Sequence, residues 1–350
     1  MVDLRKNILV SGAAGLIGSQ VVRHFLSLGY SVVGLDNNMR RQFFGPDGDT
    51  SAVAEDLSQS TSYDHVDADI RDRKHIEHIF KACRPCYIVH AAAQPSHDLA
   101  AKIPHVDFSV NAVGTLNMLE AARLNCPESP FVHVSTNKVY GDNPNKCDLI
   151  ELETRWDYAA KMDREGIDES MSLDQTTHSL FGVSKAAGDL LAQEYGRYFG
   201  MPVGVFRGGC LTGPQHAGVE LHGFLSYIVK CAVQGKKYTI HGYKGKQVRD
   251  QIHSYDVCTA FSEFMKSPRP GEVYNIGGGR QNNASILEII DMLKSMGYVL
   301  DYEISDTPRI GDHICYISDM KKFKSHYPSW QLTNSLETTV REIVESSKSR

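Results

Sequence analysis

Short apolar runs alternate with longer stretches of helical periodicity as far as Arg207. The apolar runs are Asn7–Ser11, Ser31–Leu35, Tyr87–His90, Phe131–Ser135 and Val203–Arg207. Helical patterns lie between them, for example at Val110–Leu124 and Lys185–Phe199. This alternation predicts an α/β fold, a doubly wound parallel sheet with helices on both faces. From about Gly208 the elements become shorter and the loops richer in glycine, so we expect a smaller lobe there.

The segment from Asn7 to Asp36 has the order strand, glycine loop, helix, strand and acidic residue. Gly12, Gly15 and Gly18 lie in the loop. Glycines permit a sharp turn and a close approach of the backbone to a pyrophosphate, which the start of the next helix attracts. The carboxylate of Asp36 can accept the ribose hydroxyls of NAD, and it repels the 2′-phosphate of NADP. The segment therefore predicts an NAD site.

Composition narrows the class of protein. The 350 residues carry a net charge of −5 without a basic block, so nucleic acid is not an expected partner. No signal peptide precedes the first strand and no apolar run has membrane-spanning length, so we expect a cytoplasmic protein with no membrane partner. The eight cysteines are scattered, and Cys83 and Cys86 lack the further ligands of a zinc site. We expect no metal.

Five further clusters fall at the ends of predicted strands or the starts of helices. They are Asp69-Ile70, His90-Ala91-Ala92-Ala93-Gln94, Asn111-Ala112-Val113-Gly114-Thr115, Ser135-Thr136-Asn137-Lys138-Val139-Tyr140-Gly141 and Phe181-Gly182-Val183-Ser184-Lys185. Small residues after the third strand would let a cofactor's ribose and phosphates lie against the backbone. Asp69 could contact an adenine edge, or it could cap the helix expected over residues 71–80.

With these motifs the chain resembles the extended short-chain dehydrogenase/reductase family, and within it the nucleotide-sugar epimerases and dehydratases. Gly245–His253, Tyr274–Gly279 and Pro308–Asp312 resemble later landmarks of that family. The resemblance implies NAD as the cofactor and a nucleotide-diphosphate sugar as the substrate. It also implies a homodimer or a higher homo-oligomer, because the two long helical patterns resemble the pair that relatives use in a four-helix interface.

The resemblance also implies how the chain is divided. We expect an NAD-binding Rossmann domain over residues 1–206, to which residues 246–275 return. Residues 207–245 and 276–350 are expected to form the substrate-binding lobe.

The family's pattern assigns ligand roles to individual residues. Expected cofactor ligands are Gly12, Gly15, Leu16, Ile17, Gly18, Asp36, Asn37, Asn38, Arg40, Asp69, Ile70, Ala91, Ala92, Ala93, Gln94, Asn111, Ser135 and Lys185. Expected substrate ligands are Gln94, Asn137, Cys210, His222, Gln247, Arg249 and Arg309. Guanidinium groups suit a diphosphate because they bind it in a bidentate manner, so Arg249 and Arg309 are the expected phosphate ligands. His97, His216, His222 and His253 are expected to line the sugar pocket rather than to bind a metal.

Within the family, the long stretch between Thr136 and Lys185 is similar to that of the CDP-tyvelose (CDP-paratose) 2-epimerases. Such enzymes oxidise the sugar at C2 with NAD and return the hydride to the other face. The alternatives are a dehydratase, reductase or decarboxylase acting on a related sugar nucleotide. A dehydratase usually has a carboxylate pair beside the position of Thr136, and Asn137 and Lys138 stand there instead.

The family's catalytic helix opens with Tyr-x-x-x-Lys, whose phenol is the general base, and Phe181 occupies the phenol position here. Lys185 and Thr136 stand at the other two catalytic positions. Losing one acid–base group commonly lowers the rate by about 10²–10⁴-fold. Three interpretations stay open. Thr136 with a water, Lys185 or Cys210 replaces the phenol; Phe181 is an engineered change; or the chain binds its ligands without turnover.

Overall fold

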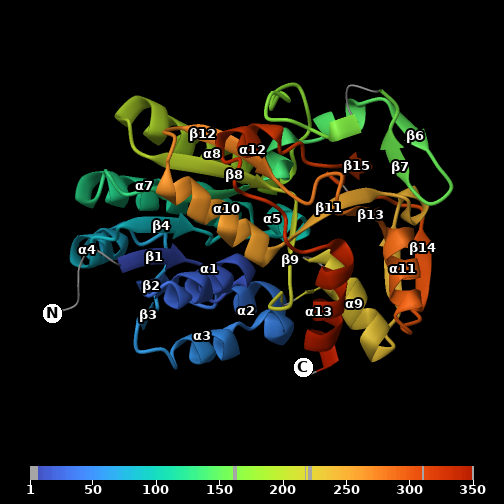
Figure 1. Cartoon of the computed structure of the whole chain (residues 1–350), viewed down its shortest axis with the longest axis horizontal. Helices are drawn as coiled ribbons and strands as arrows, with labels where there is room; N and C mark the ends of the chain where they lie inside the picture. Colours follow the sequence, from blue (N-terminus) through green and yellow to red (C-terminus); the bar gives the residue numbers. More distant parts are fainter. Residues whose placement is uncertain (1–6, 161–163, 217, 220–222, 310, 349–350) are drawn as a thin grey trace. The chain divides into compact units, whose positions relative to one another are not determined.

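The computed structural model describes residues 7–160, 164–216, 218–219, 223–309 and 311–348. The chain forms two compact units (Figure 1). The first comprises Met1–Val139, Leu180–Arg207 and Val257–Tyr274, and the second comprises Tyr140–Ser179, Gly208–Asp256 and Asn275–Arg350.

A seven-stranded parallel sheet forms the centre of the first unit, which confirms the predicted doubly wound α/β fold. Its strands are β1 (Asn7–Ser11), β2 (Ser31–Leu35), β3 (Tyr63–Val66), β4 (Tyr87–His90), β5 (Phe131–Thr136), β8 (Val203–Gly208) and β12 (Glu272–Ile276). The spatial order is β12-β8-β5-β4-β1-β2-β3, so the chain changes direction at β1. The loops after β1 and β4 therefore diverge at the carboxyl edge, where folds of this class bind ligands.

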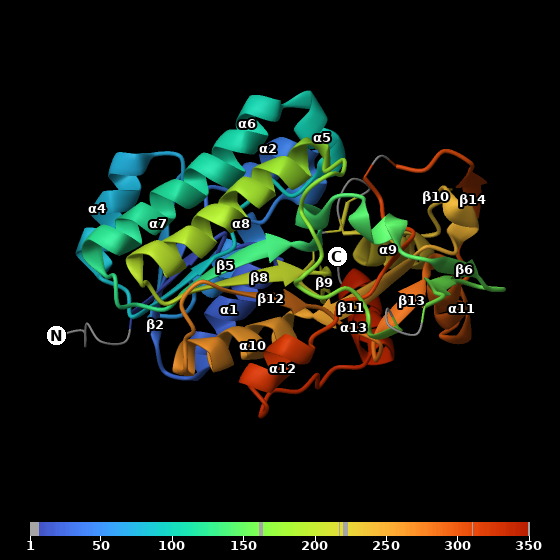
Figure 2. The same ribbon diagram turned by 90° about the horizontal axis from the view of Figure 1, so that it is seen from above.

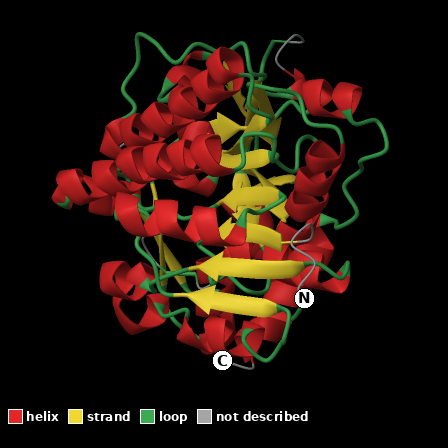
Figure 3. Ribbon diagram, turned by 90° about the vertical axis from the view of Figure 1, so that its left-hand side faces the viewer, coloured by secondary structure: helices red, strands yellow, loops and turns green. Residues whose placement is uncertain are grey.

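Helices lie on both sides of these strands (Figure 3). One face is covered by α4 (Arg73–Cys83), α7 (Gly114–Asn125) and α8 (Ser179–Phe199), whose apolar side chains share a buried core with the strands. Figure 2 shows α7 and α8 side by side on this face. On the other face α1 (Leu16–Ser27) and α10 (Ser254–Lys266) are joined by a hydrogen bond of 2.9 Å between His24 Nε2 and Ser262 Oγ.

The second unit contains smaller sheets. Its strands are β6 (Leu149–Glu151), β7 (Trp156–Tyr158), β9 (Cys210–Thr212), β10 (Tyr238–His241), β11 (Val248–His253), β13 (Asn283–Ser285), β14 (Tyr302–Ser305) and β15 (Cys315–Tyr316). Strand β11 pairs with β9, β13 and β15, whereas β10 pairs with β14 and β6 pairs with β7. Apolar residues of α9 (Phe224–Gln234), α11 (Ile286–Ser295) and α13 (Leu336–Lys348) form the core of this unit.

Shorter helices complete the chain. They are α2 (Met39–Phe44), α3 (Ser51–Leu57), α5 (His97–Lys102), α6 (Pro104–Phe108) and α12 (Lys321–His326).

Two details differ from the sequence prediction. The helix expected over residues 71–80 begins at Arg73, and its N-cap is Asp72, whose side chain accepts from His75 N. The alternative that Asp69 caps this helix is therefore wrong. The helix expected from Val110 begins as a π-helical turn at Ser109–Val113 before α7 continues it.

Two histidines, His90 on β4 and His133 on β5, are buried next to each other with ring centroids 5.4 Å apart. His90 lies within 2.7 Å of Ser11 Oγ and 3.0 Å of Thr115 Oγ1. Burial, with a smaller effect of the Lys185 charge, lowers the pKa of His90 to about 3. Burial, with smaller effects of the Lys185 and His90 charges, lowers the pKa of His133 well below its usual value.

These histidines predict acid sensitivity of the fold. Below about pH 6.5 the unfolded chain gains protons that the folded state does not accept, so stability falls as the pH drops. Each histidine contributes at most about 1.4 kcal/mol per pH unit in this window. We expect His133→Leu to reduce the slope of unfolding free energy against pH, measured by urea denaturation between pH 7.5 and 5.5. The exposed His78→Gln is the control. An unchanged slope in His133→Leu would contradict the interpretation.

Candidate functional site

Gly12 and Gly18 let the backbone of the loop after β1 and of the start of α1 pack closely against neighbouring backbone. Gly12 adopts a φ of +70°, and a Cβ there would lie 2.8 Å from Ala92 N. A Cβ on Gly18 would overlap the carbonyl oxygen of Gly12. Helix α1 starts after Gly15 with no side-chain cap and no acidic residue in its first turn. Its N-terminus thus offers N–H groups and positive potential to an anion, as the NAD site requires.

Asp36 connects the end of β2 to this loop. Its Oδ2 accepts from Ala14 N at 2.9 Å, and its Oδ1 accepts from Asn38 N at 2.8 Å. Each carboxylate oxygen keeps capacity for a further hydrogen bond, which ribose hydroxyls can supply. Asn38 adopts a left-handed φ of 51° and donates to Asp49, so the turn is held by its own side chains. Asn37 Oδ1 accepts from Met39 N in the same turn.

The basic and acidic residues flanking the expected adenosine site are engaged with neighbours. The guanidinium of Arg40 lies 4.9 Å from the centroid of the Phe44 ring, and burial lowers the pKa of Arg40 to about 10. Arg41 pairs with Asp49 at 3.2 Å. Asp69 receives hydrogen bonds from the backbone and guanidinium of Arg71, which lower the pKa of its carboxyl. Ile70 is buried and would touch a Cβ on Gly114.

Lys185 lies on α8 with its ammonium buried behind the end of β5. Its Nζ donates to the carbonyl oxygen of Val134 at 2.8 Å. Burial lowers the pKa of Lys185 to about 8, although the charges of Asp189 and Asp107 oppose that effect. Asp189 in turn accepts from Ser135 Oγ at 2.6 Å and pairs with Arg207 at 2.9 Å. Ser135 and Lys185, both expected cofactor ligands, thus share one buried charge network.

A second buried network fixes the loop after β4. Asn111 Nδ2 donates to Asp107 Oδ1 and to Ser184 Oγ, both at 3.0 Å, and Asn111 Oδ1 accepts from Gln94 N. Gln94 Nε2 donates to Asp107 Oδ1 at 2.7 Å and to the carbonyl oxygen of Ser96. Gln94 and Asn111 were expected to bind ligands, but their side-chain amides mostly form hydrogen bonds within the protein.

Phe181 lies in the first turn of α8 and is 6% exposed. Its ring centroid lies 5.1 Å from that of His97, at an interplanar angle of 46°. Thr136 ends β5, where its Oγ1 accepts from Lys138 N at 3.2 Å and donates to Asn137 Oδ1 at 3.4 Å. The catalytic positions of the family are thus occupied by a hydroxyl, an ammonium and an apolar ring.

In the second unit Asp312 contacts both expected phosphate ligands, the side chain of Arg249 and the backbone of Arg309. Arg249 on β11 is buried and donates to Asp312 Oδ1 at 2.5 Å. Burial alone would lower the pKa of Arg249, but Asp312 and the Cys210 thiol raise it above its usual value. Asp312 N donates to the carbonyl oxygen of Arg309, so the two arginines are linked through one residue. Cys210 pairs in register with Gln251. His222 lies outside the described residues.

One face of β11 carries a buried polar side chain, Gln251, that sequence reasoning did not assign. Gln251 is 2% exposed, and neither amide atom has a hydrogen-bond partner among the described residues. Gln247 Oε1 is likewise buried without a partner there, although its Nε2 donates to His241 O. Buried polar groups normally find partners, so these atoms indicate a polar ligand. The two-residue spacing from Arg249 was the available signal, because alternate residues share a strand face.

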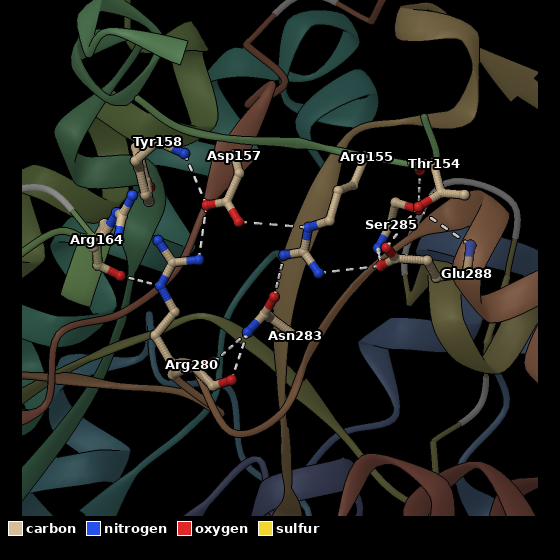
Figure 4. A network of polar contacts seen from close by, with 10 residues as sticks. Thr154, Arg155, Asp157, Tyr158, Arg164, Arg280, Asn283, Ser285 and Glu288 are labelled. Atoms are coloured by element: carbon tan, nitrogen blue, oxygen red, sulfur yellow. Dashed lines mark hydrogen bonds and ion pairs between the residues drawn. The ribbon is translucent and has the colours of Figure 1, made fainter. Parts of the chain in front are cut away.

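The long stretch between Thr136 and Lys185 contains the β6–β7 hairpin, which a polar network anchors within the second unit (Figure 4). Arg155 contacts Glu288 Oε2 at 3.3 Å, and Thr154 Oγ1 donates to Glu288 Oε1 at 3.0 Å. Arg280 pairs with Asp157 at 2.7 Å. A pocket of about 460 Å³ beside this network contains none of the expected substrate ligands. Its residues are Ile150, Leu152, Asp157, Tyr158, Arg164, Glu165 and Arg280.

Cys83 and Cys86 are free thiols, and burial raises the pKa of both, that of Cys83 to about 12. Across the described ranges, no three histidine, cysteine or acidic side chains are grouped so that they could hold a metal ion. Within the same ranges, every helix is too short or too polar to cross a membrane.

Comparison with known proteins gives one consistent relationship. The profile of the NAD dependent epimerase/dehydratase family matches residues 8–277. The CDP-paratose 2-epimerase of Salmonella typhi is 32% identical over 323 residues, covering 90% of this chain and 91% of that protein. The dTDP-glucose 4,6-dehydratase of Shigella flexneri is 29% identical over 362 residues, covering 97% and 91%.

Solved structures agree with the fold. UDP-glucose 4-epimerase of Thermotoga maritima, solved with UDP-glucose, superposes with a TM-score of 0.78 at 26% identity. The match covers 98% of this chain and 99% of that one. A tyrosine-to-phenylalanine variant of UDP-glucuronic acid 4-epimerase from Bacillus cereus gives a TM-score of 0.81 at 24% identity, with the same coverage.

The position of Asp36 predicts cofactor selectivity. We expect Asp36→Ala to weaken NAD binding by about 10–100-fold, because hydrogen bonds to a charged group are lost, and to bring NADP affinity close to that of NAD. Titration of cofactor-free protein with each dinucleotide measures both constants. Asp64→Ala, at an exposed position on β3, should leave both unchanged. Undiminished preference for NAD in Asp36→Ala would contradict the assignment.

Proposed function

The chain belongs to the NAD dependent epimerase/dehydratase family, and from this premise we propose that it is a CDP-hexose 2-epimerase. NAD, when bound, accepts a hydride from the sugar carbon and returns it to the opposite face. The observation that carries the proposal is that one chain contains both a glycine loop with Asp36 in its first unit and the polar face of β11 around Arg249 in its second. The first suits a dinucleotide, and the second suits an anionic, polar ligand.

Different residues of the chain bind the cofactor and the sugar nucleotide. Asp36 accepts the ribose hydroxyls of the adenosine half, and the α1 N-terminus neutralises the pyrophosphate of the cofactor. Lys185, with a pKa of about 8, is mostly charged at neutral pH and holds the other ribose. Arg249 and Arg309 bind the diphosphate of the sugar nucleotide, with Asp312 fixing the orientation of Arg249.

The choice of a CDP-hexose rests on two observations. The CDP-paratose 2-epimerase of Salmonella typhi is similar over 90% of the chain. In addition, the stretch between Thr136 and Lys185 that resembles that group contains Thr154 and Arg155, which anchor the β6–β7 hairpin. A 4,6-dehydratase is the second candidate, because such enzymes are also among the relatives. The neighbours of Thr136 are Asn137 and Lys138 rather than acids, which favours the epimerase.

We also propose a homodimer built on α7 and α8. Large apolar side chains are exposed along these helices and the residues just before α7, in a unit whose own core is already filled. They are Phe108, Val113, Leu116, Leu124, Leu180, Val183, Leu190, Tyr198 and Phe199. Exposed apolar side chains on two adjacent helices suit a second copy, since pairing with it would bury them.

The proposed reaction predicts a defined substrate preference. Incubation with CDP-, GDP- and UDP-hexoses should convert a CDP-hexose into its C2 epimer, seen by NMR of the products. Arg249→Ala should raise KM by about 10–100-fold through loss of a charge-assisted contact, whereas the exposed Arg341→Ala should not. Release of water with a 4-keto-6-deoxy product would favour the dehydratase. Cofactor and sugar-nucleotide binding with no product would favour the non-catalytic binder.

The proposed interface predicts the assembly state. Sedimentation at micromolar concentration should show a dimer, and Leu190→Glu should produce monomers because it places a charge in an apolar contact. Leu190 is 50% exposed. Val299→Glu, at a position that is 77% exposed in the second unit, should remain dimeric. Sedimentation of the unmodified protein as a monomer would contradict the proposed dimer.

A further inference from the structure

The proposed reaction needs a proton acceptor that Phe181 cannot provide. A sugar hydroxyl loses its proton as its carbon gives up hydride, and the ketone must regain a proton when the hydride returns. We propose that the imidazole of His97 is the catalytic acid–base group, in place of the phenol that relatives carry at position 181. The inference deepens the proposed function and rests on it.

Contact between the two rings places His97 beside the vacant acid–base position. The centroids of His97 and Phe181 are 5.1 Å apart, so the imidazole packs against the ring that stands in place of the phenol. Phe181 is buried, whereas His97 is half-buried at the start of α5. Both ring nitrogens of His97 are covered by protein atoms, and the apolar ring of Phe181 forms a wall on one side of the imidazole.

The network behind His97 holds its backbone in place relative to α8. Ser96 N donates to Gln94 Oε1 at 2.6 Å, and Ser96 Oγ caps α5 by accepting from Leu99 N. Gln94 binds Asp107, which also accepts from Asn111. Asn111 then reaches Ser184 Oγ, three residues after Phe181. The loop that carries His97 and the helix that carries Phe181 are therefore connected by consecutive buried hydrogen bonds.

The other polar groups nearby suit this role less well. Lys185 donates to Val134 O and is needed as a cation, and its charge also offsets Asp107 and Asp189. Thr136 has a hydroxyl that is far too weakly acidic to stay deprotonated. An imidazole is ordinarily half-protonated near pH 6.5, so it can accept and return a proton at neutral pH.

A single base accounts for the proton transfers of both half-reactions. In the first half-reaction the hydroxyl proton moves to an imidazole nitrogen of His97 while the carbon's hydride leaves. In the second half-reaction the hydride returns to the other face of the ketone, and His97 gives its proton to the oxygen. The histidine ends as it began, so no second acid is required.

Activity of paired variants tests the role. His97→Asn should lower kcat on the CDP-hexose by about 10²–10⁴-fold with little change in KM. Phe181→Tyr alone should give no large gain, because His97 already supplies the group. In the variant that combines His97→Asn with Phe181→Tyr, the tyrosine should restore kcat to at least a tenth of the value of the unmodified protein. A purely structural role for His97 would not show this rescue. Full activity in His97→Asn, or a gain of about 10²–10⁴-fold in Phe181→Tyr alone, would overturn the proposal.

A second measurement needs no sugar nucleotide. The His97 imidazole, identified by the signal missing in His97→Asn, is titrated by NMR in protein loaded with NAD or with NADH. The oxidised nicotinamide is positively charged, so we expect a His97 pKa lower by about half a pH unit or more with NAD. The charged groups around it, Asp107 and Lys185 in the network and Asp98 and Lys102 on α5, are the same in both forms.

Together the two measurements distinguish a wrong placement of His97 from a wrong proposed function. Equal His97 pKa values with NAD and NADH would overturn the placement of His97 beside the cofactor. A pKa difference in a protein that converts no sugar nucleotide would refute the proposed function, while supporting the position of His97.

Discussion

The buried ammonium of Lys185 is the constraint around which the first unit is arranged. A charge out of contact with water must be compensated by neighbours, or the fold loses several kcal/mol. Val134 O accepts a hydrogen bond from the ammonium, while Asp189 and Asp107 supply opposite charge. Asp189 also binds Arg207 and Ser135, so α8, β5 and β8 are fixed to one another by a single charge network.

That arrangement explains how an active site can persist without its usual phenol. The position of α8 is set by the charges around Lys185 and by Asn111, and neither depends on the side chain at residue 181. Phe181 keeps the apolar packing of an aromatic ring and leaves the network unchanged. The chemical function can then move to a neighbour, and the imidazole of His97 is the titratable ring in contact with it.

Much of the first unit could be predicted from the sequence because its signals are local. Alternating apolar runs located β1, β2 and β4, and the spacing of Gly12 to Asp36 predicted the loop that the structure shows. The helix start at Arg73 was missed because Asp69 and Asp72 are equally good caps by sequence, and Asp69 is taken by Arg71.

Contacts between distant residues could not be predicted in this way. Strand β5 and the β6–β7 hairpin lie between His97 and Phe181 in the sequence, and only the fold places their rings together. The internal hydrogen bonds of Gln94 and Asn111 also depend on tertiary structure, so a ligand role was a reasonable expectation for both. Gln251 is different, because its two-residue spacing from Arg249 on one strand was visible in the sequence.

The central claim is that this site moves a hydride away from a sugar carbon and back again. The most direct measurement follows deuterium placed at C2 of the CDP-hexose, with the product analysed by mass spectrometry and NMR. Transient oxidation predicts a C2 epimer that retains the deuterium at C2 and takes up none from solvent. Loss of the deuterium to water, with a solvent hydrogen at C2, would show inversion by carbon deprotonation and would contradict the account.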